Sequence, residues 1–462
     1  MARAMGEATQ QPGRECQGRH RGPFREVAAA VRGWPASLLR LTLATTDDRN
    51  AWNLCVEVFW ATILTSVASF NAAYALRLGA ENRHIGLLTS LPALMAAAVS
   101  VPAGRFLERR SRRKAWVLGS LFVHRLGYLL VAALPWVPLG GLNRGAALVV
   151  LLVVLGLPAH LFNVGFHAML AEVIPPRRRA AVVATRSTIS VATTSLGLFL
   201  VGQWLARVRF PINYGIAFLG GCAAAMVSTA YLYRVRVPDA PPSPAAPAAE
   251  RRSLGGALRA LCAELRAQPL FVRFTTSTLV YNLAAWAVAP LYVLYYVRER
   301  GADEGWLGLL GTVSSVASIV GYVLWRRLIA RWGELPTLRR TVAGAGLFPV
   351  LAGLSPTLTP ILFAAGLDGL IVTGINLSHY TSFLRVVPEE RRTFFVGLYI
   401  TVMNIGAFIA PLVGVALASR VGLAPVIVGC GLCRALASLM FSVWSLGDGR
   451  AKDSDADIID KR

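Results

Sequence analysis

The chain has 462 residues, of which 55% are hydrophobic and only 15% are charged, and its mean hydropathy is +0.54. Soluble domains carry about a quarter charged residues, so this composition excludes an ordinary soluble globular protein. The formal net charge of +23 is large enough for a nucleic-acid-binding protein, and the positions of the basic residues decide between that partner and a membrane.

Residues 1–45 form the first predicted region, a polar and arginine-rich tail interrupted by Pro12, Pro23 and Pro35. The apolar run from Val27 to Val31 is too short for the core of a signal peptide, so we expect no cleaved signal. We interpret the region as a weakly ordered cytoplasmic tail, with room for an interfacial helix around residues 38–43.

Twelve apolar stretches follow, most of them close to the ~20 residues that a helix needs to cross a bilayer core. They form two groups of six, within residues 46–236 and 267–447, and the eighth and ninth are the weakest. Their centres are Leu64, Ala96, Arg125, Leu157, Leu196, Ala223, Ala284, Val316, Leu347, Leu370, Gly406 and Arg434. The sequence therefore predicts an all-α integral membrane protein with twelve transmembrane helices in the lipid bilayer.

Residues 237–266 separate the two groups of spans and are predicted to be a cytoplasmic linker. The prolines between Pro238 and Pro247 remove backbone donors and fix φ, so the first part of the linker cannot form regular structure. Apolar residues then recur at helical spacing, which suits a helix on the membrane surface, at Leu254, Leu258, Leu261 and Leu265. Residues 448–462 are predicted to be a polar cytoplasmic tail.

Basic residues gather in the loops between alternate spans, and the intervening loops carry few of them. The basic loops contain Arg105, Arg109, Arg110, Arg112, Arg113 and Lys114, then Arg177–Arg179, then Arg251, Arg252, Arg259 and Arg266, then Arg326, Arg327, Arg331, Arg339 and Arg340, then Arg391 and Arg392. Positive loops stay on the cytoplasmic side, so we expect both termini to be cytoplasmic. A nucleic-acid partner explains the total charge but not this alternation, and we reject it.

Cysteine and lysine usage adds two further expectations. Cys430 and Cys433 form a C-x-x-C pair inside the last apolar stretch, without a second pair or a nearby histidine, so we expect no metal or redox cofactor there. Lysine occurs only at positions 114, 452 and 461, and the preference for arginine is typical of a GC-rich bacterial genome. We therefore expect the bacterial cytoplasmic (inner) membrane.

The two groups of spans share a repeated pattern. The stretch from Tyr74 to Leu88 returns 222 positions later, from Tyr296 to Leu310, with identical residues at six of fifteen positions. A second pattern, which starts at Asn163, returns 213 positions later from Asn376. Two parallel repeats in a membrane chain are typical of a transporter whose halves rock against each other.

The end of the second span reads Gly104-Arg-Phe-Leu-Glu108-Arg109-Arg110-Ser111-Arg112-Arg113. This resembles the loop between the second and third spans of the major facilitator superfamily, a pattern of G-x-x-x-D/E-R-x-G-R-R/K. Gly104, Glu108, Arg109, Arg112 and Arg113 occupy the informative positions, whereas Ser111 replaces the usual glycine. The equivalent site in the second half is degraded. With the repeat, the spans and the linker, the resemblance covers all of the chain except its tails.

The resemblance implies a role for this motif as a latch that holds the cytoplasmic side shut in the outward-open state. Gly104 would let two helices approach closely. Glu108 would pair with arginines and with the positive N-terminus of a neighbouring helix. The alternative is a charge cluster at a helix end that only fixes topology, and we favour the latch.

Polar side chains inside membrane spans are costly to bury and are therefore the default site candidates. The resemblance implies that the first, fourth, seventh and tenth spans line a central cavity. The candidate substrate or proton residues are Glu57, Asn71, His160, Asn163, His167, Asn282, Trp286, Asp368, Asn376 and His379. The repeat-equivalent Asn163 and Asn376 would face each other across the pseudo-two-fold axis, either at the substrate or as a hydrogen-bonded contact between helices.

Glu57 and Asp368 are the candidate proton carriers, because a carboxyl group in a low dielectric can load and release a proton. We prefer Glu57, since its equivalent at the 222 offset, Leu279, is uncharged. The alternatives are that Glu57 is an interfacial acid or that it pairs with Arg125. His160 and His167 could also titrate, although a histidine in a helix is more often a structural hydrogen-bonding residue.

The most consistent function is secondary active transport of a small organic molecule by alternating access. The resemblance adds the expectations of proton coupling and efflux, and we expect a monomer without a cofactor. No lysine follows a glycine as a phosphate-binding loop requires, and catalytic groups do not cluster, so we expect neither a pump nor an enzyme. A non-transporting receptor or assembly factor on the same fold is the alternative.

Overall fold

The protein is described by a computed structural model that covers residues 45–108, 110, 112–237, 264–388 and 392–443. Within these ranges the regular structure is entirely helical, which confirms the predicted all-α class. The predicted N-terminal tail, nearly all of the predicted linker with its amphipathic helix, and the predicted C-terminal tail lie outside the described residues.

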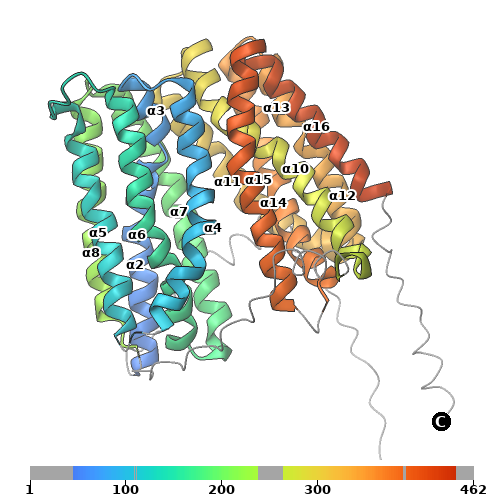
Figure 1. The fold of residues 1–462 in the computed structure, drawn as a ribbon, viewed down its shortest axis with the longest axis horizontal. Coiled ribbons are helices and arrows are strands. Elements are labelled where there is room, and N and C mark those ends of the chain that lie inside the picture. Colours follow the sequence, from blue (N-terminus) through green and yellow to red (C-terminus); the bar gives the residue numbers. More distant parts are fainter. Residues whose placement is uncertain (1–44, 109, 111, 238–263, 389–391, 444–462) are drawn as a thin grey trace, which may run out of the picture. The chain divides into compact units, whose positions relative to one another are not determined.

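The first half of the described chain contains six long helices in the predicted order (Figure 1). The first of them, α2, is continued by the short α3, and η1 is a single 3₁₀ turn after α5. The bounds are α2 (Thr46–Ala68), α3 (Asn71–Arg77), α4 (Asn82–Glu108), α5 (Arg113–Ala133), η1 (Leu134–Trp136), α6 (Arg144–Val173), α7 (Pro176–Arg207) and α8 (Ile212–Arg234).

The second half repeats this order with one interruption. A π-helical turn, η2, extends α10, and the ninth predicted span is divided between α12 and α13 on either side of Gly346. The bounds are α10 (Pro269–Leu294), η2 (Tyr295–Glu299), α11 (Glu304–Trp332), α12 (Glu334–Ala345), α13 (Leu347–Leu354), α14 (Leu358–Val386), α15 (Arg392–Val421) and α16 (Leu423–Val443).

Ten helices among the described residues are long and apolar enough to cross a membrane. The other two predicted spans correspond to α4, which has 27 residues, and to the α12–α13 pair. At 1.5 Å per residue, 27 residues reach about 40 Å, which exceeds the ~30 Å hydrocarbon core. The twelve predicted span positions are therefore all helical, and the eighth, predicted as weak, is an unbroken helix of 29 residues.

The repeat is visible in the backbone at its two equivalent glycines. Gly79 and Gly301, which are 222 positions apart, have φ angles of 86° and 64°, a region that residues with a Cβ rarely adopt. Each glycine ends one helical unit, and a new helix begins three residues later. Asp303 caps the second of these helices by accepting a hydrogen bond from the Trp306 amide at 2.7 Å.

Each half has a packed interior, and one buried apolar cluster spans both halves. In the first half, α2 packs against α7 and α8, and Tyr74 stacks on Tyr214 with ring centroids 4.4 Å apart. In the second half, α10 packs against α15 and α16, and α11 against α14. Phe274 joins α10 to α14 and α16 through the rings of Phe383 and Phe441.

Most of the packing between the halves comes from two helix pairs, α7 with α11 and α4 with α15, and α4 also touches α10. Gly202 and Gly308 make the first crossing close. A Cβ on Gly308 would lie 2.4 Å from the Leu198 carbonyl oxygen, and a Cβ on Gly202 would lie 2.9 Å from the Cα of Gly308. Gly86, the repeat equivalent of Gly308, faces Val415 on α15. The repeated glycines thus lie at the two crossings between halves.

Polar contacts also join the halves, at the end of the bundle that carries Gly79 and Gly301, here called the Gly79 end. Arg77 donates to both carboxylate oxygens of Glu304, at 2.8 and 2.9 Å, and the Tyr214 hydroxyl donates to Oε1 at 3.2 Å. In the opposite direction, Arg298 donates to the Asn82 side chain and, at 2.7 Å, to the Ala80 carbonyl. Glu304 is only 4% exposed, so this contact is buried.

Candidate functional site

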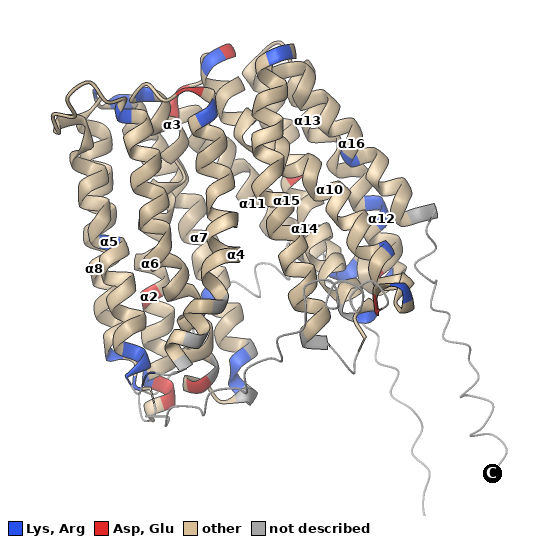
Figure 2. Cartoon of the chain, viewed as in Figure 1, with Lys and Arg blue, Asp and Glu red and all other residues tan. Residues whose placement is uncertain are grey.

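Charged residues gather at the helix ends, and few lie along the middle of the helices (Figure 2). In the described part of the chain, five charged residues lie eight or more positions from both ends of their helix. They are Glu57, Arg125, Arg186, Asp368 and Arg434. Charges at this depth are costly in a bilayer and mark functional or tightly paired sites. They form two clusters, one in each half.

The first cluster is built around Glu57 on α2, which is 3% exposed. Arg186 on α7 donates from Nη1 to Oε2 of Glu57 at 2.8 Å, and the Ser228 hydroxyl on α8 donates to Oε1 at 3.0 Å. The alternative pairing of Glu57 with Arg125 is also present, since Nη2 of Arg125 lies 3.8 Å from Oε1. One carboxylate therefore faces two guanidinium groups.

Arg125 on α5 is held mainly by α8. Its Nη1 donates to the Ala225 carbonyl and to the Thr229 hydroxyl, both at 2.5 Å, and its Nη2 donates to the Ser228 hydroxyl at 2.8 Å. Its side chain is 5% exposed. Arg125 therefore ties α5, α8 and Glu57 together inside the first half and has little contact with solvent.

A cavity of about 400 Å³ adjoins this cluster and is called here the first-half cavity. Four helices supply its walls, namely α2, α5, α6 and α7. Its polar lining consists of Glu57, Thr62, Thr65, His124, Arg125, Asn163, His167, Arg186 and Ser190. Three of the predicted candidates, Glu57, Asn163 and His167, thus meet at one cavity.

The second cluster is built around Arg434 on α16. Its Nη2 donates to the Tyr281 hydroxyl at 2.7 Å, and its guanidinium lies 5.0 Å from the centre of the same ring. Arg434 also acts electrostatically on Asp368 of α14. Oδ1 of Asp368 is buried and has no hydrogen-bond partner in the described ranges. Asp368 therefore differs from Glu57, whose two oxygens both accept hydrogen bonds.

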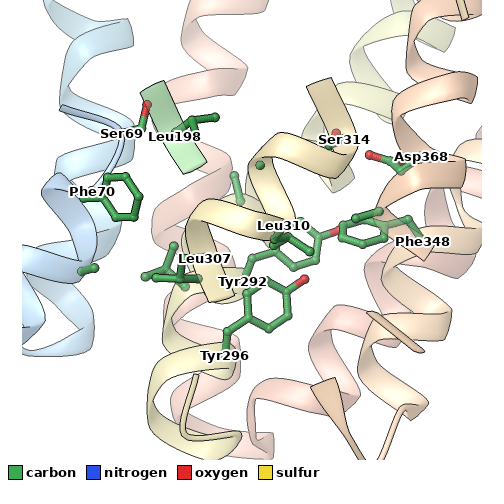
Figure 3. Close-up of a pocket in the computed structure, with 15 residues that line it drawn as sticks. Ser69, Phe70, Leu198, Tyr292, Tyr296, Leu307, Leu310, Ser314, Phe348 and Asp368 are labelled. Atoms are coloured by element: carbon green, nitrogen blue, oxygen red, sulfur yellow. The ribbon is translucent and has the colours of Figure 1, made fainter. Parts of the chain in front are cut away.

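Asp368 lines a second cavity of about 400 Å³, called here the central cavity because both halves contribute to it (Figure 3). The first half supplies Ser69, Phe70, Ala73 and Leu198. The second half supplies Ala289, Tyr292, Val293, Tyr296, Leu307, Leu310, Gly311, Ser314, Phe348, Ala365 and Asp368. The hydroxyl groups of Tyr292 and Tyr296 are buried without a partner, like Oδ1 of Asp368. The cavity thus combines apolar and aromatic walls with unpaired polar atoms.

The remaining candidates are dispersed. Asn71 lines a separate cavity of about 320 Å³ within the first half. His160 is half-buried on α6. His379 lies 3.0 Å from the Thr278 hydroxyl and packs against Phe274 in the interior of the second half. These contacts are typical of a structural histidine.

The last four candidates are two residues of α10 and the repeat-equivalent asparagines. Asn282 contacts the Met403 sulfur at 3.8 Å, and Trp286 packs beside Gly406. Asn163 and Asn376 are both exposed, and in the described part of the chain no hydrogen bond joins them. The second interpretation of that pair, a hydrogen-bonded contact between helices, is therefore not realised in this conformation.

The motif between the second and third spans is described only in part. The Glu108 side chain and Arg109 lie outside the described residues, and Arg112 is exposed. Arg113 lies 3.5 Å from Glu172 at the end of α6. Among the described residues, no atom lies within 4 Å of the position that a Cβ on Gly104 would take, and the close helix approach at this glycine stays a prediction.

Several site residues escaped the sequence interpretation. Arg186 lies only a few residues beyond the basic run at 177–179 and looks like part of it. Tyr292 and Tyr296 are indistinguishable from core aromatic residues by pattern alone. Tyr296 is the repeat equivalent of Tyr74, but the structure alone separates them. The Tyr74 hydroxyl donates to the Val131 carbonyl at 3.1 Å, whereas the Tyr296 hydroxyl has no partner among the described residues.

Two parallel six-helix repeats with a cavity between them are the architecture of a secondary-transporter fold. Residues 57–285 and 274–460 each match the Major Facilitator Superfamily. The protein belongs to this superfamily, which confirms the predicted family and the predicted two-repeat fold.

Individual relatives are more distant. The multidrug resistance protein MdtG of Yersinia enterocolitica is 28% identical over 148 residues, which are 31% of this chain and 36% of that protein. The alignment thus spans about a third of the length of this curated relative.

Solved structures extend the similarity over nearly the whole fold. A bacterial homologue of the human lysosomal transporter Spinster, in an inward-facing and unoccupied conformation, has a TM-score of 0.60 at 14% identity, covering 87% of this chain and 97% of that one. A mutant of the nucleoside transporter NupG has a TM-score of 0.62 at 11% identity, covering 85% and 99%. Identities this low show a common fold and nothing about the substrate.

Proposed function

We propose that the protein is a secondary active transporter that moves a small organic molecule across a bacterial inner membrane by alternating access. The central cavity is the observation that carries the proposal, because residues of both halves line it. A molecule held there contacts both halves, so their relative movement would change the side from which it is accessible. The cavity volume of about 400 Å³ is in the range of small-molecule sites.

The cavity lining favours an amphipathic molecule. Phe70, Tyr292, Tyr296 and Phe348 provide aromatic surface, while Asp368 and the two tyrosine hydroxyls provide polar atoms without protein partners. Mostly apolar walls with a few convergent polar groups are typical of small-molecule sites. The name of the relative MdtG, a multidrug resistance protein, supports efflux as the direction.

Proton coupling is part of the proposal, with Asp368 as the carrier in preference to Glu57. Both oxygens of Glu57 accept hydrogen bonds, from Arg186 and Ser228, so a proton would have to displace a donor. Oδ1 of Asp368 has no donor, and the residue lines the cavity between the halves. Asp368 is therefore the acid that can exchange a proton as the cavity changes sides.

Reconstitution tests the proposal directly. Purified protein in proteoliposomes is supplied with fluorescent amphiphiles of different charge (fluorescein, ethidium and N-phenylnaphthylamine) with and without an imposed pH gradient. We expect saturable exchange of at least one probe and net movement against its gradient when the pH gradient is present. The absence of protein-dependent exchange of every probe, together with co-purification of a stoichiometric protein partner, would favour the receptor or assembly-factor alternative.

Two variants separate coupling from binding. Asp368→Asn should lose gradient-driven movement and keep exchange, since exchange requires no deprotonation in each cycle. Glu57→Gln is the matched comparison and should keep its response to the gradient. The reverse pattern would assign the proton to Glu57, and a wild type that ignores the gradient would remove proton coupling from the proposal.

A further inference from the structure

The net charge of the deeply placed residues differs between the two halves. In the second half, the deep charges are one carboxylate, Asp368, and one guanidinium, Arg434, which together are neutral. In the first half they are one carboxylate, Glu57, and two guanidinium groups, Arg125 and Arg186, which leave one positive charge. An uncompensated charge in a low-dielectric interior is strongly unfavourable, so a mobile anion would stabilise the first half.

The structure indicates which arginine carries the unused charge. The donors of Arg125 are directed to α8 and Glu57, and its side chain is 5% exposed. Every described hydrogen bond of Arg186, by contrast, uses Nη1, which donates to Glu57 and to the Leu54 carbonyl. Its side chain is 13% exposed and lines the first-half cavity. The Nε and Nη2 edge of Arg186 therefore has no acceptor among the described residues.

That edge has the geometry of an oxyanion receptor. Nε–H and Nη2–H are parallel donors on one side of a planar guanidinium, and they match two oxygens of a carboxylate, phosphonate or phosphate group. Phe166 packs on the guanidinium plane with 5.1 Å between its ring centre and Cζ, which limits the orientations of Arg186. The fork is thus fixed in place before any ligand arrives.

The other cavity walls add donors and no further acid. Asn163 on α6 and His167, one turn further on, are exposed and have no hydrogen-bond partner in the described part of the chain. Ser190 lies one turn beyond Arg186 on α7 and lines the same cavity. Glu57 is the only carboxylate among the residues that line this cavity, and it is already occupied by Arg186 and Ser228.

We propose that the first-half cavity binds the single anionic group of an organic molecule, a carboxylate or phosphonate, with the free edge of Arg186 as its receptor. This inference rests on the proposed transport function and names its substrate class as small organic anions. Arg186 then specifies charge, whereas the aromatic central cavity accepts the apolar part of transported molecules. Glu57 weakens the site by sharing Arg186, which keeps the anion releasable.

Binding of matched aromatic probes tests the site. Isothermal titration on the purified full-length protein in an uncharged maltoside detergent compares benzoate and phenylphosphonate with benzyl alcohol and benzyltrimethylammonium. We expect saturable binding of the two anions only. A charge-assisted hydrogen bond contributes enough that Arg186→Gln should weaken anion binding about tenfold or more. Equal binding by Arg186→Gln, or no saturable binding of either anion to the wild type, overturns the proposal.

Two further variants distinguish a receptor from a structural arginine. Glu57→Gln releases Nη1 and removes the competing charge, so anion binding should strengthen, whereas damage to the fold would weaken it. Asn163→Asp changes an exposed cavity residue and should weaken anion binding without altering the melting temperature. If neither variant shifts anion affinity in the stated direction, the cavity does not recognise charge.

A lipid headgroup carries the same kind of anionic group, and a second titration distinguishes it from a free organic anion. The titration with phenylphosphonate is repeated in nanodiscs of phosphatidylcholine with and without phosphatidylglycerol. An unchanged affinity supports a free organic anion, and competition by phosphatidylglycerol assigns the site to lipid and overturns the substrate proposal. Exchange of ethidium but not of fluorescein by proteoliposomes would leave transport intact and reject only the anion class.

Discussion

Glu57 and Asp368 are both acids inside membrane helices, yet their surroundings give them different chemistry. Glu57 is fixed by an arginine, a serine and a second arginine at longer distance. Asp368 borders a cavity with one buried oxygen unpaired. A paired carboxylate stabilises one charge distribution, whereas an unpaired one can respond to a proton or a ligand. The same residue class is thus fully hydrogen-bonded in one half and partly unpaired in the other.

Arg125 gives a stability prediction at this scale. Arg125→Leu leaves the acceptors on α8 unsatisfied and removes a charge that faces Glu57. Breaking one side of a buried ionic network costs about 3–5 kcal/mol, so the variant should melt well below the wild type. Thermal unfolding followed by intrinsic tryptophan fluorescence measures the change.

Arg434→Leu is the comparison for Arg125→Leu, because the described hydrogen bonding of Arg434 is a single bond, to the Tyr281 hydroxyl. We expect the smaller loss of melting temperature for Arg434→Leu. The double variant Arg125→Leu/Glu57→Gln should lose less than the sum of the two single losses, since both substitutions disrupt the same contact between Arg125 and Glu57. Strictly additive effects would contradict coupling between Arg125 and Glu57.

Residue patterns predicted the two acids and, as an alternative, the pairing of Glu57 with Arg125, but not the closer partners of Glu57. Glu57 and Asp368 are conspicuous because carboxylates are rare inside apolar spans. Whether an acid is paired depends on residues that are distant in sequence, such as Arg186 on α7 and Ser228 on α8. The local spacing of residues does not show that these two lie beside Glu57. The sequence favoured Glu57 over Asp368 because of the repeat alone. It could not show that packing pairs Glu57 with Arg186 and Ser228.

Helix crossings give a prediction at the scale of elements. Gly308 on α11 lies against the backbone of α7, where a Cβ would come within 2.4 Å of the Leu198 carbonyl oxygen. Gly308→Ala should therefore force α7 and α11 apart and lower stability by about 1–3 kcal/mol. Gly104→Ala is the matched control, because no atom lies within 4 Å of its added Cβ.

Melting temperatures of the two glycine variants decide this prediction. Gly308→Ala should melt earlier than the wild type, and Gly104→Ala should melt at the same temperature or slightly higher, because alanine favours helix. Equal melting temperatures for both variants would contradict the close crossing. Slow transport by Gly104→Ala at unchanged stability would indicate that this glycine acts in a different conformation, as the latch interpretation requires.

Element boundaries were predictable to different degrees. Long apolar stretches gave the number and order of helices, because span length is fixed by the bilayer. The division of the ninth span at Gly346 was not predicted, although Pro349 lacks the amide that would bond to the Ala345 carbonyl. A Cβ on Gly346 would lie 2.4 Å from the Gly431 carbonyl oxygen, so α16 packs closely against the interruption.

At the scale of the whole molecule, the repeat relates two of the polar contacts that join the halves, both at the Gly79 end. Asn82 and Glu304 are equivalent at the 222 offset, and each accepts from an arginine of the opposite half. The arginines are one position out of register, since Arg77 plus 222 is 299 and the donor is Arg298. The sequence revealed the repeat but not these crossed contacts, because the repeat fixes each half and not the surface on which the halves meet.

Alternating access requires both crossed contacts to break when the Gly79 end opens, and this gives the last prediction. Glu304→Gln removes the buried ion pair with Arg77 and should favour the opened state. Asn82→Asp should convert the Arg298 contact into a second ion pair and favour the closed state. A bias of about 1–3 kcal/mol changes a two-state population roughly 5- to 150-fold.

Spin labels at positions 142 and 357 report on this end, because both residues are exposed in loops near it. Pulsed dipolar spectroscopy in nanodiscs should give one short distance for Asn82→Asp and an added longer distance for Glu304→Gln. Transport should slow in both variants, since each biases one step of the same cycle. Arg83→Gln alters a neighbouring ion pair within the first half, with Glu81, and should leave the distances unchanged. Identical distance distributions for Glu304→Gln and Asn82→Asp would mean that the crossed contacts do not control the Gly79 end.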